Sequence, residues 1–119
     1  MDLNLKNKTA FISGSTSGIG YTTAKILLQE GMKVYINGRS QKNLKKSLDQ
    51  LKKDVKGANV YGIKADFLDQ KDVHKIVNKL EEVDVLINNV GIYTSKSFFE
   101  TGIEIWEDQF YVNIMSGVT

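Results

Sequence analysis

The stretch FISGSTSGIGYTTAK, residues 11–25, joins a short apolar run to a helix-like segment through a loop with three glycines. Gly14, Gly18 and Gly20 form a G-x-x-x-G-x-G pattern. Glycine allows a tight turn and a close approach to the backbone, and the unpaired N–H groups at a helix start attract negative charge. We therefore predict a phosphate-binding loop at the head of a helix, although glycines also occur in plain turns.

Two common phosphate-binding patterns do not match this loop. The nucleoside-triphosphate loop requires G-x-x-x-x-G-K-[ST], but Tyr21 follows the last glycine. The dinucleotide pattern G-x-G-x-x-G is absent too. The physical roles still fit: Gly14 for the exit from a strand, Gly18 for the approach of a pyrophosphate, and Gly20 for close packing of helix and strand.

Strand-like and helix-like segments alternate along the chain. Short apolar runs predict strands at Thr9–Ser13, Lys33–Asn37, Asn59–Ala65 and Val83–Asn88. Apolar residues at helical spacing predict helices between them, with start signals at Ser40 and Asp69 and a stop at Gly31. The capping-box pattern of Thr101–Glu104 predicts the start of a last helix. This order favours an α/β fold, a Rossmann-like doubly wound parallel sheet that stops after about four strands.

Composition excludes several classes of function. The 41% apolar and 25% charged fractions are typical of a globular chain, and a net charge of +2 is too small to indicate a nucleic-acid partner. The lysines of Gln41–Lys56 are expected to form a solvated helix face. There is no cysteine, which fits a reducing cytoplasm, and a single histidine, His74, among polar neighbours, so we expect no metal site. Without a signal peptide or a membrane-length apolar run, we expect a cytoplasmic protein that binds no membrane.

The end of the second predicted strand indicates which dinucleotide is preferred. Sites that prefer NAD usually have an acidic residue there, but no acid lies between Met32 and Asn43, and Arg39 and Ser40 occupy the place. A guanidinium can hold a 2′-phosphate with two hydrogen bonds, and a serine can add a third. We therefore expect NADP(H) to be preferred over NAD(H). The alternative is a surface arginine beside a simple helix cap.

Four short motifs resemble the short-chain dehydrogenases/reductases. They are Ser13–Gly20 (SGSTSGIG), Ala65–Asp66, Asn88–Gly91 (NNVG) and Val112–Asn113. Each is weak alone, but the four occur in the right order and at the expected strand ends. The resemblance covers nearly the whole chain.

The resemblance implies a role for each matching position. Asp66 would bond the adenine amino group, where the alternative is a plain loop aspartate. Asn113 would support catalysis by anchoring water near the catalytic lysine, where the alternative is an exposed polar residue. We assign cofactor contacts to Gly14, Ser15, Ser17, Gly18, Ile19, Gly20, Arg39, Ser40, Asp66, Phe67, Asn88, Asn89, Val90 and Gly91.

Two positions depart from the pattern of these enzymes. Ser13 stands where they usually have threonine, so the hydroxyl is kept. Val90 stands where they usually have alanine, which adds bulk beside the cofactor without excluding it.

The catalytic groups of these enzymes, a serine and a Tyr-x-x-x-Lys pair beyond the asparagine, do not follow Asn113 in this sequence. Tyr21–Lys25 has the spacing but lies behind the glycine loop, and we interpret it as a coincidence. We therefore expect residues 1–119 to be the dinucleotide-binding segment of an NADP(H)-dependent oxidoreductase, inactive alone, with the catalytic and substrate-binding half absent. The complete enzyme would act on a small carbonyl or alcohol, and a bare sheet edge predicts a homo-oligomer. The alternatives are a non-catalytic dinucleotide-binding or assembly module and a decayed gene product.

Overall fold

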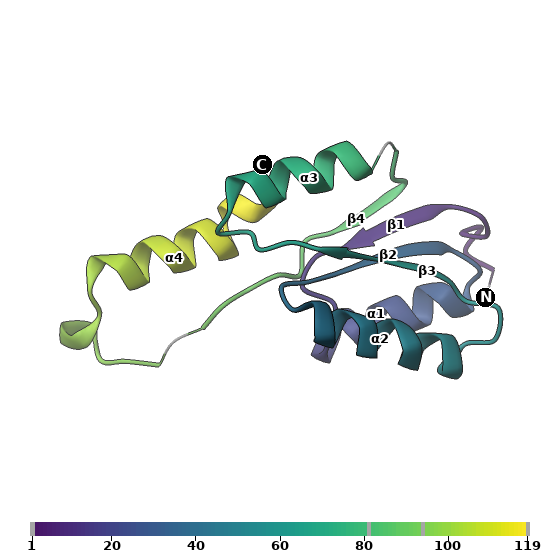
Figure 1. Cartoon of the computed structure of the whole chain (residues 1–119), viewed down its shortest axis with the longest axis horizontal. Coiled ribbons are helices and arrows are strands. Elements are labelled where there is room, and N and C mark those ends of the chain that lie inside the picture. The colour runs from purple at the N-terminus through teal and green to yellow at the C-terminus, as the bar shows by residue number, and fades with distance from the viewer. Residues whose placement is uncertain (1, 81, 94, 119) are drawn as a thin grey trace.

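The computed structural model describes residues 2–80, 82–93 and 95–118. Four parallel strands form a sheet in the order β3-β2-β1-β4 (Figure 1). They are β1 (Thr9–Ile12), β2 (Lys33–Gly38), β3 (Asn59–Lys64) and β4 (Val85–Ile87). All four predicted strands are confirmed, and β4 is shorter than its apolar run. The Rossmann-like α/β prediction is also confirmed.

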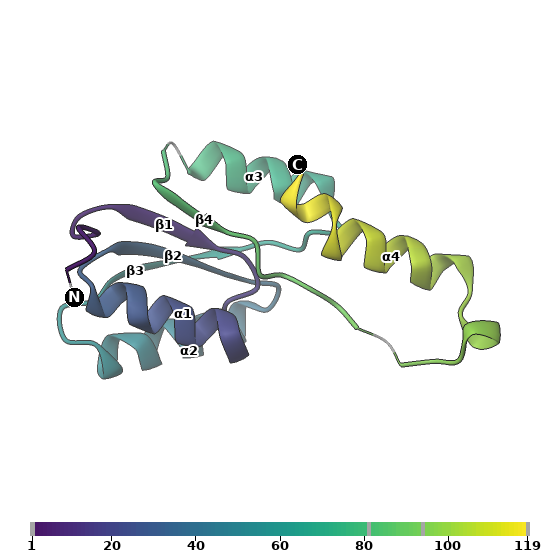
Figure 2. The same ribbon diagram turned by 180° about the vertical axis from the view of Figure 1, so that it is seen from behind.

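The helices cover both faces of the sheet, as β-α-β connections require. They are α1 (Gly18–Gln29), α2 (Gln41–Asp54), α3 (Gln70–Lys79) and α4 (Ile103–Asn113), with short 3₁₀ turns η1 (Phe98–Glu100) and η2 (Met115–Gly117). α1 and α2 lie on one face and α3 on the other, and both views show α4 running away from the sheet (Figures 1 and 2). None of the described helices combines the length and apolar character that a membrane crossing needs.

The core lies mainly between the sheet and the α1–α2 layer. Its fully buried side chains include Ile12, Met32, Ile36 and Leu51. A smaller cluster on the α3 side contains Phe11, Ile63, Ala65 and Ile76. In the lysine-rich helix α2, Leu44 and Leu51 lie on the buried face.

The helix starts confirm two predicted caps and correct a third. Ser40 accepts the N–H of Asn43 at 3.3 Å, and Asp69 accepts that of Lys71 at 2.9 Å. The capping box predicted at Thr101–Glu104 is wrong, because α4 begins after Gly102 and the Thr101 hydroxyl donates to the carbonyl of Ser97. The box lies four residues earlier, at Ser97–Glu100, where it caps η1.

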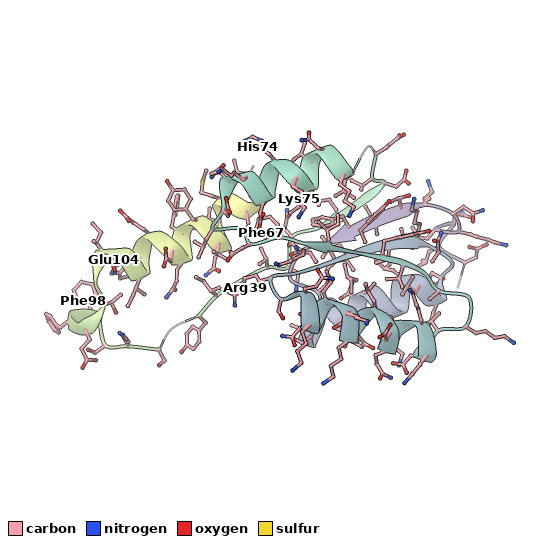
Figure 3. The ribbon with its side chains drawn as sticks, in the orientation of Figure 1. Arg39, Phe67, His74, Lys75, Phe98 and Glu104 are labelled. Carbon is pink, nitrogen blue, oxygen red and sulfur yellow. The ribbon has the colours of Figure 1, made fainter. Side chains whose placement is uncertain are left out.

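Residues 93 and 95–113, which we call the arm, are the least compact part of the described chain. The radius of gyration is 15.4 Å, whereas a compact domain of this length has about 13.5 Å. Figure 3 shows Phe98 at the far end of the arm, and Phe99 is 95% exposed. Among the described strands, β4 pairs with β1 alone, so its other edge is open.

Asn37, the buried polar residue near the end of β2, ties the neighbouring chain segments together. Its side-chain oxygen accepts the N–H of Gly14 at 3.0 Å, and its amide nitrogen donates to the carbonyls of Ile63 (3.1 Å) and Ala65 (3.3 Å). Its own N–H donates to the Ser15 hydroxyl at 2.9 Å. One amide thus joins β2, the end of β3 and the glycine loop.

We expect Asn37→Ala to lower the free energy of unfolding by about 2–5 kcal/mol, because it leaves buried backbone groups without partners. Urea denaturation followed by circular dichroism measures the change. Asn59→Ala, at an exposed position at the start of β3, is the matched control and should shift stability by less than about 0.5 kcal/mol. Equal effects of the two substitutions would contradict this role for Asn37.

Candidate functional site

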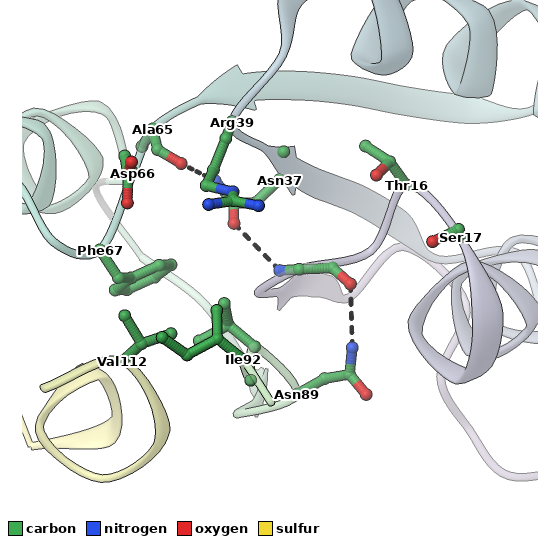
Figure 4. Close-up of a pocket in the computed structure, with 14 residues that line it drawn as sticks. Thr16, Ser17, Asn37, Arg39, Ala65, Asp66, Phe67, Asn89, Ile92 and Val112 are labelled. Carbon is green, nitrogen blue, oxygen red and sulfur yellow. Dashed lines mark hydrogen bonds between the residues drawn. The ribbon is translucent and has the colours of Figure 1, made fainter. Parts of the chain in front are cut away.

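A cleft of ≈ 310 Å³ opens at the carboxyl ends of the strands. It lies where the chain order reverses, with β2 on one side of β1 and β4 on the other. Ligands of open α/β sheets bind at such a switch point. The cleft is lined by Gly14, Thr16, Ser17, Asn37, Gly38, Arg39, Ala65, Asp66, Phe67, Asn89, Val90, Gly91, Ile92 and Val112 (Figure 4).

The glycine loop forms one wall of the cleft and leads into α1. Gly14 has a φ of +59°, and a Cβ there would lie 2.9 Å from the Cα of Val90. At Gly20 a Cβ would come within 2.5 Å of the Asn89 amide and 2.9 Å of the Gly14 carbonyl oxygen. Both positions therefore require glycine, one for its backbone conformation and both for close packing.

The start of α1 fits an anionic group. Its N-cap residue, Ser17, makes no side-chain capping bond among the described residues, and no acid lies in the first turn. The first N–H groups of a helix have no partner within the helix, and the helix dipole adds positive potential there. The loop and the helix start therefore suit a pyrophosphate.

Hydrogen bonds from the end of β4 hold the loop in place. The Ser13 hydroxyl accepts the N–H groups of Asn89 and Val90, both at 3.0 Å. The Asn89 amide donates to the carbonyls of Ser13 (3.2 Å) and Gly14 (3.0 Å). The hydroxyl that Ser13 shares with the usual threonine is thus used, and the extra bulk of Val90 lies against Gly14.

Arg39 and Asp66 supply the charges of the cleft. Arg39 is exposed, and its guanidinium forms no ion pair or hydrogen bond with a described residue. Figure 4 draws it between Asp66 and the glycine loop. One carboxylate oxygen of Asp66 accepts the N–H of Leu68 at 3.0 Å, while the Asp66 N–H donates to Asp72 at 2.8 Å. These bonds fix the turn that carries Asp66.

Phe67, Ile92 and Val112 form an apolar part of the lining, with Val112 buried on α4 (Figure 4). The adjacent Asn113 is exposed, but its amide pairs with the backbone of Ile92, accepting at 2.7 Å and donating at 2.9 Å. α4 ends at Asn113. This side chain therefore connects α4 to the segment that follows β4.

The cleft brings together many of the residues expected from the sequence. Those that line it are Gly14, Ser17, Arg39, Asp66, Phe67, Asn89, Val90 and Gly91. Those outside the lining are Ser15, Gly18, Ile19, Gly20, Ser40 and Asn88. Gly18 and Ile19 are exposed at the start of α1, and Gly20 is buried beneath the loop. Ser15 donates to the carbonyl of Ile12, Ser40 caps α2, and Asn88 lines an apolar hollow beside α3.

Sequence reasoning missed several residues of the site, among them Thr16, Gly38 and Ile92 in the lining. It also missed two residues whose hydrogen bonds shape the site. Asn37 is described above, and Ser47 donates its hydroxyl to the carbonyl of Thr16 at 2.8 Å, joining α2 to the glycine loop. Each had a signal in the sequence: Asn37 is a polar residue at the end of an apolar strand, and Ser47 lies within an apolar helical stripe.

Tyr21 and Lys25 lie outside this cleft. The Tyr21 hydroxyl donates to Asp54 on α2 at 3.2 Å, and Lys25 lies 3.9 Å from the same carboxylate. Burial raises the pKa of Tyr21, and the charge of Asp54 and the hydrogen bond to it raise that pKa further. An acid–base tyrosine working near neutral pH needs a lowered pKa. The pair therefore links two helices.

Comparison with known proteins places these features in one family. The family model of the short chain dehydrogenases matches residues 8–119. The chain is 40% identical over 118 residues to the uncharacterized oxidoreductase YvaG of Bacillus subtilis, covering 99% of this chain and 45% of YvaG. It is 30% identical over 118 residues to the 3-oxoacyl-[acyl-carrier-protein] reductase FabG of Aquifex aeolicus, covering 96% of this chain and 47% of FabG.

A solved structure shows the same fold. The L-sorbose reductase of Gluconobacter frateurii, complexed with NADPH and L-sorbose, superposes with a TM-score of 0.90 at 27% identity, covering 99% of this chain and 46% of the reductase. The chain thus spans about half the length of the relatives that it matches. With the matching model over residues 8–119 and a four-stranded sheet of the same architecture, the chain belongs to the short-chain dehydrogenase family of oxidoreductases.

Proposed function

We propose that residues 1–119 are the cofactor-binding part of an NADP(H)-dependent oxidoreductase. One observation carries this proposal: a single cleft joins a helix start without a side-chain cap to the Arg39 guanidinium, which pairs with none of the described residues. The first suits a pyrophosphate and the second a further phosphate, as NADP(H) requires. The bound dinucleotide would supply or accept a hydride, and the partner substrate would be a small carbonyl or alcohol.

The residues of this chain hold and orient the cofactor. The backbone N–H groups of the exposed residues Gly18 and Ile19 would meet the pyrophosphate, and Gly14 and Gly20 let the loop pack closely against Val90 and Asn89. On the adenosine side, the carboxylate of Asp66 would accept the adenine amino group. Asn89 and Val90 would lie beside the ribose, where both already line the cleft.

Arg39 determines the expected preference for the 2′-phosphorylated cofactor. It has no carboxylate partner among the described residues, so its hydrogen-bonding edge is available to a ligand. No acid lies at the end of β2 to bind a free ribose hydroxyl pair or to repel a phosphate. The NADPH bound in the L-sorbose reductase complex is consistent with this proposal.

The acid–base chemistry would come from groups outside these residues. By resemblance, the catalytic serine and the Tyr-x-x-x-Lys pair would follow Asn113 in the complete enzyme, and the relatives are about twice as long as this chain. Asn113 would act as a positioning residue, because its amide already fixes the backbone of Ile92 beside the cleft. We propose that these 119 residues bind cofactor without reducing a substrate, and that the complete enzyme works in the cytoplasm.

The exposed arm favours a second candidate, an assembly module that binds a dinucleotide without catalysis. Among its apolar side chains, Tyr93 is 85%, Phe98 73% and Trp106 57% exposed. Exposed aromatic groups that lie close together are typical of contact surfaces, and Phe98 and Trp106 are 6.5 Å apart between ring centroids. We propose that the chain self-associates through the arm in either case.

Calorimetric titration of the purified chain with NADPH and NADH tests the cofactor proposal. We expect tighter binding of NADPH. Arg39→Ala should weaken NADPH binding roughly 10- to 100-fold, because it removes charge-assisted hydrogen bonds worth about 1.5–3 kcal/mol, and should leave NADH within about twofold. Lys53→Ala, in the last turn of α2, is the control for loss of positive charge. Tighter binding of NADH, or an unchanged NADPH affinity of Arg39→Ala, would refute the proposal.

Gly20→Ala tests the loop itself. The added methyl group would meet the Asn89 amide and the Gly14 carbonyl, so both dinucleotides should bind about tenfold or more weakly, without a change in preference. Gly102→Ala adds a methyl group where nothing lies within 4 Å and should leave binding unchanged. The same titration measures both variants. Normal binding to Gly20→Ala would show that the loop does not hold the cofactor.

Light scattering at micromolar concentration tests self-association. We expect a mass of at least twice that of one chain, and Trp106→Gln should raise the dissociation constant at least about tenfold by removing an aromatic contact. Glu107→Gln changes the next exposed residue of α4 and serves as the control. A monomeric wild-type chain at this concentration would rule out the proposed contact.

A further inference from the structure

A second hollow of ≈ 390 Å³ lies on the other side of the glycine loop, between the start of α1 and the side of α2. Thr16 and Ser17 line both this hollow and the cofactor cleft. The two spaces therefore meet at these residues. A group bound beside Arg39 in the cofactor cleft would therefore lie next to the second hollow.

One face of α2 forms the far wall of the second hollow. Asn43, Lys46 and Gln50 are spaced by three and four residues, so they share a face of the helix. Ser47, which is 6% exposed, fixes this face against the loop through its 2.8 Å bond to the Thr16 carbonyl. The helix that carries Lys46 is thus held at the residues where the two spaces meet.

Lys46 provides a positive charge that the described protein groups do not use. Its ammonium forms no ion pair or hydrogen bond with a described residue, and neither does the side chain of Asn43. The carboxylate of Asp54, deeper between α1 and α2, already accepts bonds from Tyr21 and from Gln50 (2.9 Å). The Lys46 ammonium and the Asn43 amide are therefore available to a ligand.

We propose that Lys46, assisted by Asn43, is a second anchor for the 2′-phosphate of NADP(H) and a determinant of cofactor preference. The inference rests on the proposed function. A phosphate monoester carries a charge of about −1.5 to −2 near neutral pH, more than one guanidinium neutralises. Arg39 would bind two phosphate oxygens from the cleft side, and Lys46 would donate to the remaining oxygen from beyond Thr16 and Ser17. NADH has no such phosphate and gains nothing from Lys46.

The test titrates the wild-type chain, Lys46→Gln and Lys45→Gln with NADPH and NADH. Lys46→Gln should weaken NADPH binding about five- to tenfold and leave NADH within about twofold, because one charge-assisted contact is lost. Lys45 is the matched control, since it is the neighbouring exposed lysine of α2 and does not line the second hollow. Its substitution changes net charge equally and should change neither affinity.

Adenosine 2′,5′-bisphosphate and adenosine 5′-monophosphate isolate the adenosine side of the cofactor. Lys46→Gln should weaken the bisphosphate alone, and Lys46→Arg should restore most of its binding. If Arg39→Ala weakens NADPH while Lys46→Gln does not, the second anchor is refuted and the proposed function stands. Equal weakening of NADPH and NADH by Lys46→Gln also refutes it. A wild-type chain that prefers NADH overturns both proposals.

Discussion

The glycine loop keeps its shape because polar side chains at three strand ends bond to it. Ser13 accepts two N–H groups from the end of β4, Asn37 binds the Gly14 N–H from β2, and Asn89 donates to the Gly14 carbonyl. Such bonds are individually modest, but leaving a buried backbone group without a partner is costly. The loop is therefore held in position before any ligand arrives, and its N–H groups need little reorganisation to meet one.

The fold could be predicted from the sequence because the apolar runs are short and separated by helical stripes. Parallel strands buried on both faces are nearly continuous in apolar residues, and β1 and β2 follow that rule. The edge strand β3 buries only Val60 and Ile63, yet its apolar run is still bounded by turn residues. The last helix was harder, since Ser97–Glu100 and Thr101–Glu104 both have the capping pattern. In the structure the capping box at Ser97–Glu100 begins η1. The spacing of the residues alone does not indicate which of two adjacent capping patterns begins a helix.

The candidate site could be predicted only in part, for a different physical reason. The glycine spacing and the arginine that follows β2 are local features of the sequence, so the loop and Arg39 can be predicted from it. Asn37 and Ser47 act through contacts with segments 23 and 31 residues away, Gly14 and Thr16, and no local pattern reports such pairings. Asn88 and Asn89 are adjacent in the chain, yet only Asn89 lines the cleft, because successive residues of an extended chain point to opposite sides.

The long-range pairing of β1 with β4 also affects the order in which this chain folds during synthesis. Bonds between Ser13 and Asn89 span 76 residues, so they form only after most of the chain has left the ribosome. Contacts of such high sequence separation slow folding, because the chain loses the conformational entropy of loop closure before these contacts can stabilise it. The α1–α2 layer with β1, β2 and β3 can assemble first, leaving the cleft without the wall that follows β4. Under the proposed function, cofactor affinity would then appear late during synthesis, once β4 has paired with β1.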